Sequence, residues 1–155
     1  MRITFVSNVS LPIRTGPSMT AAARSNYFIQ NYDVTLWYPY VNERFQTKLW
    51  GVMMSKEIYI TYLRKELVID KRVRIELYDS EYDSMLRWQY PASASELLRI
   101  VLSVEDVVVF EDCVSIIIKY PHIFFTPKRC VHVIHTDYVN ILPMIPREIS
   151  LKYIK

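Results

Sequence analysis

The sequence predicts an α/β fold in which an open parallel sheet is flanked by helices. Apolar, strand-like runs alternate with amphipathic helical segments four or five times along the chain, and this alternation is typical of strand–helix units that build a parallel sheet. The nearly unbroken valine run at 106–110 suits a strand covered on both faces. A length of 155 residues, 51% of them hydrophobic, suits a single domain, 1–155, with a sizeable core.

Five strands are predicted from apolar runs bounded by polar or turn residues. They cover 2–7, 33–38, 72–78, 106–110 and 129–134. Pro39 should limit the second strand because proline has no N–H for the ladder. The aromatic residues around it are Trp37, Tyr38 and Tyr40. They could stack on sugar rings or lie in a membrane interface, but packing under the following loop is the favoured interpretation. Residues 41–54 are predicted to be irregular, with room for a short edge strand, and 79–92 to be a polar, aromatic loop.

Helices are predicted between the strands at 18–30, at 56–68 and from Ser93 onward. Ser18 is a candidate cap for the first helix, and Ser93 with Glu96 matches the Ser-x-x-Glu capping box. The residues expected to face inward are Met19, Ala22, Ala23 and Tyr27 in the first helix and Tyr59, Tyr62, Leu63 and Leu67 in the second. Residues 114–120 suit either a short helix or a strand, and 146–155 form a final helical segment.

Composition argues against several classes of protein. No apolar stretch reaches the roughly 18 residues of a membrane span, and Asn8 and Pro12 interrupt the N-terminal apolar run, so neither a transmembrane segment nor a signal peptide is expected. We therefore expect a cytoplasmic protein, with any membrane contact peripheral and made through residues such as Arg87, Trp88 and Lys128. The net charge is only +3 without a run of like charges, which gives no support for nucleic-acid binding.

The two cysteines and the histidines give little support for a disulfide or a metal. Without a secretion signal, Cys113 and Cys130 are better read as buried thiols than as a disulfide. The spacing of Cys130, His132 and His135 could suggest zinc, but strand alternation places the first two on one face and His135 on the other. We therefore predict no metal and no cofactor.

Three loops should meet at one edge of the predicted sheet. Open α/β sheets bind ligands beyond the carboxyl ends of their strands, at the switch in strand order. The Gly16 loop follows the first strand, Glu111 and Asp112 follow the fourth, and His135 follows the fifth. In a Rossmann-like order the first and fourth strands are neighbours, which predicts a common crevice.

Each of these residues also has a simpler structural interpretation. Gly16 is one of only two glycines; it could let an anion approach a helix N-terminus or merely adopt an unusual backbone angle. His135 could bind a sugar hydroxyl or be structural. Glu111 and Asp112 could act as a base, bind hydroxyls or cap a helix. The sequence lacks G-x-G-x-x-G and a Walker A lysine motif, which disfavours an ordinary dinucleotide or P-loop site.

Six segments, in order and at similar spacing, resemble a known family. They are FVSNVSLPIRTGPSMTAAARSNYF, DVTLWYPYV, IYITYLRKEL, VRIELYDSEYDSMLRWQYP, DVVVFEDC and VHVIHTDYVNIL. They are similar to the N-terminal domain of plant-type digalactosyldiacylglycerol synthases, which are retaining GT-B glycosyltransferases that transfer galactose from UDP-galactose to a galactolipid. The resemblance implies a Rossmann-like N-terminal half of a GT-B fold, on the acceptor side.

The resemblance also implies roles for individual residues. His135 would reach the donor sugar, and Glu111 matches an acidic position at a strand end; these two are the implied catalytic residues. Asp137 departs from the family, which usually has asparagine there, and the loop at 79–90 lacks an expected glycine. The implied substrate-binding positions are Thr15, Gly16, Thr136, Asp137 and Tyr138.

The implied partners are a nucleotide-sugar donor, a lipid or glycan acceptor, and a second GT-B domain or subunit. Enzymes of this kind hold most of the donor in a second Rossmann domain, so the chain alone is expected to be inactive. A non-catalytic binding or assembly module that keeps half of the fold is the alternative. A small nucleotide- or phosphate-binding protein is a third hypothesis, disfavoured by the lack of a phosphate motif beyond one glycine.

Overall fold

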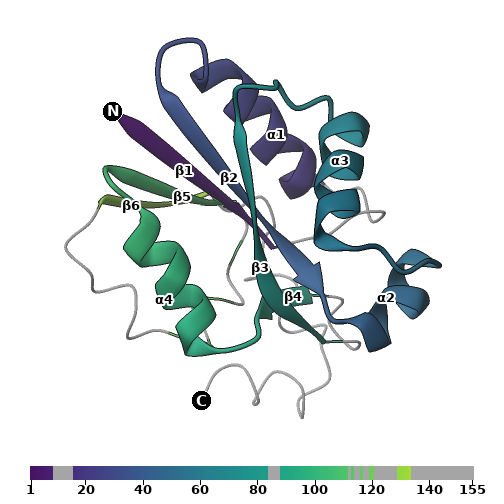
Figure 1. Ribbon diagram of the computed structural model, residues 1–155. Helices are drawn as coiled ribbons and strands as arrows, with labels where there is room; N and C mark the ends of the chain where they lie inside the picture. The colour runs from purple at the N-terminus through teal and green to yellow at the C-terminus, as the bar shows by residue number, and fades with distance from the viewer. Residues whose placement is uncertain are drawn as a thin grey trace.

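A computed structural model describes residues 1–8, 16–83, 88–111, 113, 116, 119–120 and 129–133. In these residues a six-stranded sheet has the order β4-β3-β2-β1-β5-β6 (Figure 1). Its strands are β1 (Arg2–Ser7), β2 (Asp33–Val41), β3 (Arg74–Asp83), β4 (Trp88–Pro91), β5 (Val107–Glu111) and β6 (Arg129–Val133). The predicted strand positions are confirmed, with ends that shift by a few residues.

The strand pairing is compatible with a Rossmann-like α/β fold. β1 lies between β2 and β5 and is parallel to both, while β3 and β6 extend the parallel sheet on either side. The predicted adjacency of the first and fourth parallel strands is therefore confirmed. The expectation of a wholly parallel sheet is wrong, because β4 pairs antiparallel with β3. β3 and β4 occupy much of 79–92, where a loop was predicted.

Helices cover both faces of the sheet (Figure 1). α1 (Gly16–Phe28) and α3 (Lys56–Glu66) lie on one face, and α4 (Ala94–Ser103) lies on the other. A short helix, α2 (Glu43–Trp50), follows β2 near α3. The arrangement is the one that alternating strand–helix units favour.

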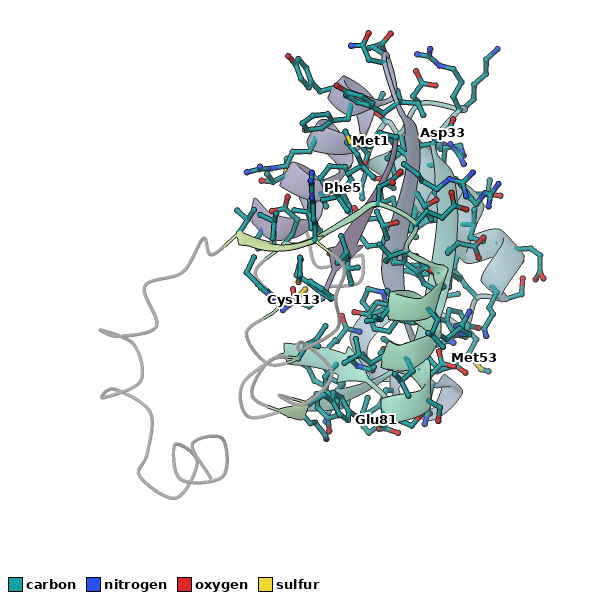
Figure 2. All side chains as sticks on the ribbon, turned by 90° about the vertical axis from the view of Figure 1, so that its left-hand side faces the viewer. Met1, Phe5, Asp33, Met53, Glu81 and Cys113 are labelled. Atoms are coloured by element: carbon teal, nitrogen blue, oxygen red, sulfur yellow. The ribbon has the colours of Figure 1, made fainter. Side chains whose placement is uncertain are left out.

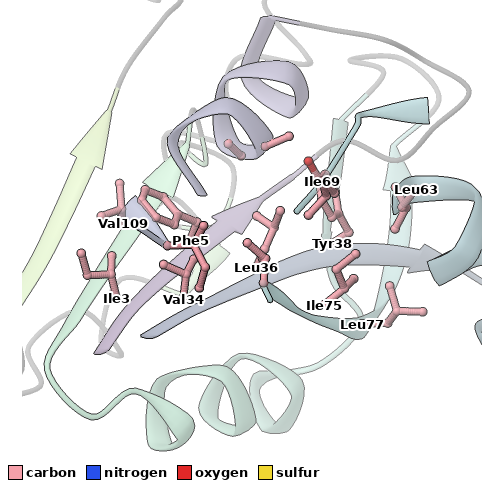
Figure 3. Close-up of a cluster of buried hydrophobic side chains, with 14 of the residues drawn as sticks. Ile3, Phe5, Val34, Leu36, Tyr38, Leu63, Ile69, Ile75, Leu77 and Val109 are labelled. Atoms are coloured by element: carbon pink, nitrogen blue, oxygen red, sulfur yellow. The ribbon is translucent and has the colours of Figure 1, made fainter. Parts of the chain in front are cut away.

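Alternate strand residues feed two apolar cores, one on each face. In β2, Val34, Leu36 and Tyr38 point into the core under α1 and α3, shown in Figure 3, while Trp37 belongs to the core under α4. Each fully buried Leu or Phe side chain contributes on the order of 2 kcal/mol by leaving water. The inward positions of Tyr59 and Leu63 on α3 are confirmed, since both are fully buried.

The first helix differs from prediction in its start and in its buried face. It begins at Gly16, so that Ser18 lies within its first turn rather than capping it. Its buried residues are Ser18, Ala21, Ala22 and Ser25, whereas Met19 and Tyr27 are 54% and 73% exposed. Small side chains let the helix backbone approach the sheet closely, and this requirement overrides the apolar periodicity.

Residues 43–50 form α2, although an irregular segment was predicted there. The buried side chain of Gln46 donates to the Val41 carbonyl (2.8 Å) and accepts from the Met54 N–H (2.9 Å). These contacts fix the helix between β2 and the chain that follows. Gly51, with φ of 72°, ends it as its N–H bonds to the Thr47 carbonyl (3.0 Å); this left-handed position favours glycine.

β2 runs through Pro39, which was expected to limit it. The pairing of β1 with β2 is recorded only as far as Trp37, whereas β2 stays paired with β3 to Val41. Pro39 therefore lies beyond the last residue of β2 that pairs with β1. On that side the strand needs no N–H group for a backbone hydrogen bond, so proline is tolerated.

The helix caps follow the sequence closely. The Ser93 hydroxyl accepts from the Glu96 N–H (3.3 Å), which confirms the predicted N-cap. The Glu96 carboxylate in turn accepts from the N–H of Asp79 (2.9 Å) and so joins α4 to β3. Within the predicted segment 114–120, the described residues Ile116 and Lys119 have helical backbone, which agrees with the helical alternative at those two positions. The predicted segment 146–155 lies outside the described residues, as do Arg87 and Lys128.

Candidate ligand crevice at the carboxyl ends of the strands

The central parallel strands end together at the edge where a ligand crevice was predicted. Ser7, the last residue of β1, is in register with Glu111, the last residue of β5, and Glu111 is in register with Val133 of β6. In Figure 2, Met1 and Asp33 mark the amino ends of the first strands, and Glu81 marks the opposite end of the sheet. The chains that leave β1, β5 and β6 therefore depart from the same edge.

Glu111 is fully buried at this edge and faces α1. Its side chain has no exposed surface, and its Oε1 lies 2.9 Å from Nε of Arg24, whose side chain is 39% exposed. The two atoms are at ion-pair distance, but their alignment does not meet the criteria of a hydrogen bond. The interaction between the two side chains is therefore mainly electrostatic. The pair ties the middle of α1 to the end of β5. A sealed, paired carboxylate is well placed to position α1, whereas a general base must reach its substrate.

Gly16 is the first residue of α1. Among the residues that the structure describes, a Cβ at this position would meet nothing within 4 Å, and the Gly16 backbone is helical without a positive φ. The explanation by an unusual backbone angle is therefore wrong. No acidic residue stands in the first turn of α1 to compete with an anion for the free N–H groups of a helix N-terminus.

Two buried tyrosines, one on each face of the sheet, form hydrogen bonds near this edge. Tyr38 of β2 donates its hydroxyl to the Ser18 carbonyl in α1 (2.7 Å), and Tyr78 of β3 donates to the Ser7 carbonyl (2.7 Å). Burial, and then the negative charge of Glu111, raise the pKa of Tyr38 well above its ordinary value. Burial is also the main cause of the raised pKa of Tyr78. Both hydroxyls therefore stay protonated and act as donors.

The cysteines are thiols that pack within the fold. Buried Cys113 lies just beyond β5 and bonds through Sγ to the Val6 and Glu111 carbonyls (3.4 and 3.3 Å). Cys130 and His132 share one face of β6, as predicted, with Sγ and Nε2 3.3 Å apart. Burial raises the pKa of the Cys130 thiol and lowers the pKa of His132. Within the described ranges, no group of three or more potential metal ligands occurs.

Of the predicted site residues, the structure brings Gly16 and Glu111 to this edge. The others lie outside the described residues: Thr15, Asp112, His135, Thr136, Asp137 and Tyr138. Sequence reasoning missed Arg24 and the hydroxyls of Tyr38 and Tyr78. The sequence does contain a hint of the role of Arg24, because a charged residue there lies between the small residues Ala21 and Ser25, which are buried in the same helix.

Comparison with known proteins adds no relative. The chain matches no model of a known protein family, and no characterised protein matches it significantly. In the part of the chain that the structure describes, no helix has the length and apolar character needed to cross a membrane.

Proposed function

We propose that this chain forms the acceptor-side half of a retaining GT-B glycosyltransferase. It would transfer a sugar from a nucleotide sugar such as UDP-galactose to a lipid or other hydroxyl acceptor. The observation that carries the proposal is the switch in strand order at β1, with Gly16 and Glu111 beside it. Ligands of open α/β sheets bind at this point, and the six ordered sequence segments supply the chemical class.

The start of α1 supports a phosphate or acceptor contact at Gly16. No described residue lies within 4 Å of a Cβ placed on Gly16, and the first turn of α1 contains no acidic residue. Within the described part of the chain, a negative group could therefore approach this helix N-terminus. Backbone N–H groups and the helix dipole favour such a group. In this proposal the donor sugar and its phosphates lie over the crevice while a second domain holds the rest of the nucleotide.

His135 would approach the donor sugar from the next strand. β6 ends at Val133, in register with Glu111, so the chain leaves β6 at the edge where β5 also ends, two positions before His135 in the sequence. A neutral imidazole there could donate to or accept from a sugar hydroxyl. Glu111 would act mainly through Arg24 by holding α1 in place, and catalysis would come from positioning and charge stabilisation at the departing phosphate.

A non-catalytic binding module is the second candidate, and the burial of Glu111 favours it. Among the described residues, Glu111 is the carboxylate to which the resemblance gives a catalytic role. Its side chain has no exposed surface and is ion-paired with Arg24. A module of this kind would bind a nucleotide sugar or a glycan without turning it over. A lipid acceptor would bring either form to a membrane surface, where contact would be peripheral.

The test is sugar transfer measured with the protein together with any second domain that its gene encodes. UDP-galactose is supplied with galactolipid vesicles, and UDP release and the glycosylated lipid are both quantified. The enzyme proposal expects both products, with a loss of about a hundredfold or more in His135→Ala, as for the removal of one key donor. It expects normal turnover in Arg129→Gln, at the first residue of β6. Saturable UDP-galactose binding without product supports the module, and normal turnover in His135→Ala contradicts the assigned role.

A further inference from the structure

The outer side of the helical layer formed by α1 and α3 carries exposed apolar side chains. Met19, Ala23 and Tyr27 follow one another at four-residue spacing along α1, and all three are exposed, Met19 to 54% and Tyr27 to 73%. A groove of about 330 Å³ leads from Met19 and Ala23 to the end of α3, where Leu67 and Val68 complete its lining. Figure 1 shows the two helices side by side on one face of the sheet. These residues therefore form one surface, which we call the α1–α3 surface.

α1 is inverted relative to an ordinary surface helix. Such helices bury their large apolar side chains and present charged ones to water. α1 instead exposes Met19 and Tyr27. Its buried residues are small: Ser18, Ala21, Ala22 and Ser25. The outward face of α1 therefore consists of side chains that gain free energy by leaving water.

Val68 adds a strained residue to the same surface. It follows Leu67, the C-cap of α3, with φ of 52°. A β-branched residue is an outlier in this left-handed region, and glycine or asparagine is the usual choice after a helix. The Val68 side chain is 77% exposed, so packing within the chain does not offset the strain. A contact with another molecule would explain why a valine stands at this position.

The few charges on the α1–α3 surface favour a second copy of this chain as the partner. A surface that meets its own copy must not place like charges together. The one charged residue of α1 is Arg24, which is ion-paired with Glu111. At the end of α3 the adjacent Lys65 and Glu66 have opposite charges, so a two-fold rotation can set Lys65 of one copy near Glu66 of the other. An anionic membrane would instead call for a cluster of Lys and Arg around the apolar side chains.

We propose that this chain forms a two-fold symmetric dimer through the α1–α3 surface, with Met19, Tyr27 and Val68 at the contact. α1 has 13 residues, so two neighbouring helices of this size, each about 20 Å long and about 10 Å wide, offer roughly 400 Å². A standard interface uses about 800 Å² from each partner. The smaller area predicts a weak dimer, with a dissociation constant on the order of 10–100 μM.

The test is analytical ultracentrifugation of the whole chain, over concentrations on both sides of the expected dissociation constant. We expect a reversible equilibrium between monomer and dimer. Met19→Lys should weaken the dimer by about a hundredfold or more, because the substitution occurs twice in a symmetric dimer and brings two like charges into the contact.

Val68→Asn separates a binding role from a structural one. Asparagine tolerates the left-handed backbone, so the urea midpoint of the dilute monomer should rise. The loss of the two valine side chains should weaken the dimer about tenfold. A residue that served only the fold would not change stability and association in opposite directions.

Leu102→Lys is the matched control. Leu102 is 74% exposed on α4, the helix on the opposite face of the sheet (Figure 1), so the dissociation constant should not change. The proposal is overturned if the unmodified protein stays monomeric over the whole range, or if Met19→Lys weakens the dimer no more than Leu102→Lys. It is also overturned if Val68→Asn leaves the dimer unchanged, or if a monomer sediments with phosphatidylglycerol vesicles and Met19→Lys abolishes that binding. No measurement requires glycosyl transfer, so this proposal and the proposed function can fail separately.

Discussion

Removing Arg24 should destabilise the protein more than removing Glu111, although the two form one ion pair. Glu111 has no exposed surface, whereas Arg24 is 39% exposed. Arg24→Gln therefore leaves a buried carboxylate without its nearest positive charge, while Glu111→Gln leaves an arginine that water can solvate. Deleting one partner of a fully buried pair costs about 3–5 kcal/mol, and an exposed pair contributes about 1 kcal/mol or less.

Because Arg24 is partly exposed, the stability lost in Arg24→Gln should lie between these two limits. For Arg24→Gln we expect about 2 kcal/mol, which lowers the Tm by roughly 4–8 °C in a chain of this size. For Glu111→Gln we expect about 1 kcal/mol or less. The double variant should be nearly as stable as Glu111→Gln alone, because the buried negative charge has then been removed together with Arg24. Arg72→Gln, which breaks a solvent-accessible pair with Asp70, is the matched control and should destabilise the protein less than Arg24→Gln.

Urea unfolding at neutral pH provides the assay, and the double variant checks the cause. If the buried carboxylate left without Arg24 is the cause, removing that carboxylate as well should recover most of the lost stability. The reasoning is refuted if Arg24→Gln costs no more than Glu111→Gln, or if the double variant is no more stable than Arg24→Gln alone.

Three further predictions concern single sites. Gly16→Ala should keep or raise the Tm, because the new Cβ meets no described residue within 4 Å and alanine favours a helix by up to about 1 kcal/mol. In the transferase proposal this substitution should lower kcat/KM, and unchanged transfer would argue against a ligand at Gly16. Tyr78→Phe should cost about 1–2 kcal/mol in urea unfolding, because it leaves the buried Ser7 carbonyl without its 2.7 Å donor; a neutral result would contradict that role. Hydrogen bonds from Arg72 lower the pKa of Asp70 to about 2, so this carboxylate stabilises the fold above its unfolded pKa of about 4 and stops doing so as pH falls toward 2. Asp70→Asn should lose that acid dependence, and a carbon-detected titration of the Asp70 carboxyl with a midpoint near 4 would show the depression to be absent.

Local signals in the sequence predicted most of the secondary structure. The runs at β1 and β5 are apolar enough to specify covered strands, and the Ser93 hydroxyl caps α4 because its chemistry is local to one turn. The same holds for α3, where Tyr59 and Leu63 fall on one helical face. The adjacency of β1 and β5 followed from the alternation of strands and helices and the usual order of such sheets.

Other features depend on partners that are distant in sequence. α2 forms where Gln46 can reach both Val41 and Met54, and no short pattern in 43–50 announces those contacts. The antiparallel β4 arises because Trp88–Pro91 meets β3, which extends farther than its apolar run. Both are cases in which tertiary packing overrides local propensity.

For the candidate site, the sequence by itself determined which loops leave the carboxyl ends of the strands and that Gly16 and Glu111 stand there. Only the tertiary structure decided what those residues face. It placed no other described residue within 4 Å of a Cβ on Gly16. It also buried Glu111 against Arg24, because small residues bring α1 close to the sheet. Burial and charge pairing are properties of groups brought together by folding, and a linear sequence records the groups without their distances.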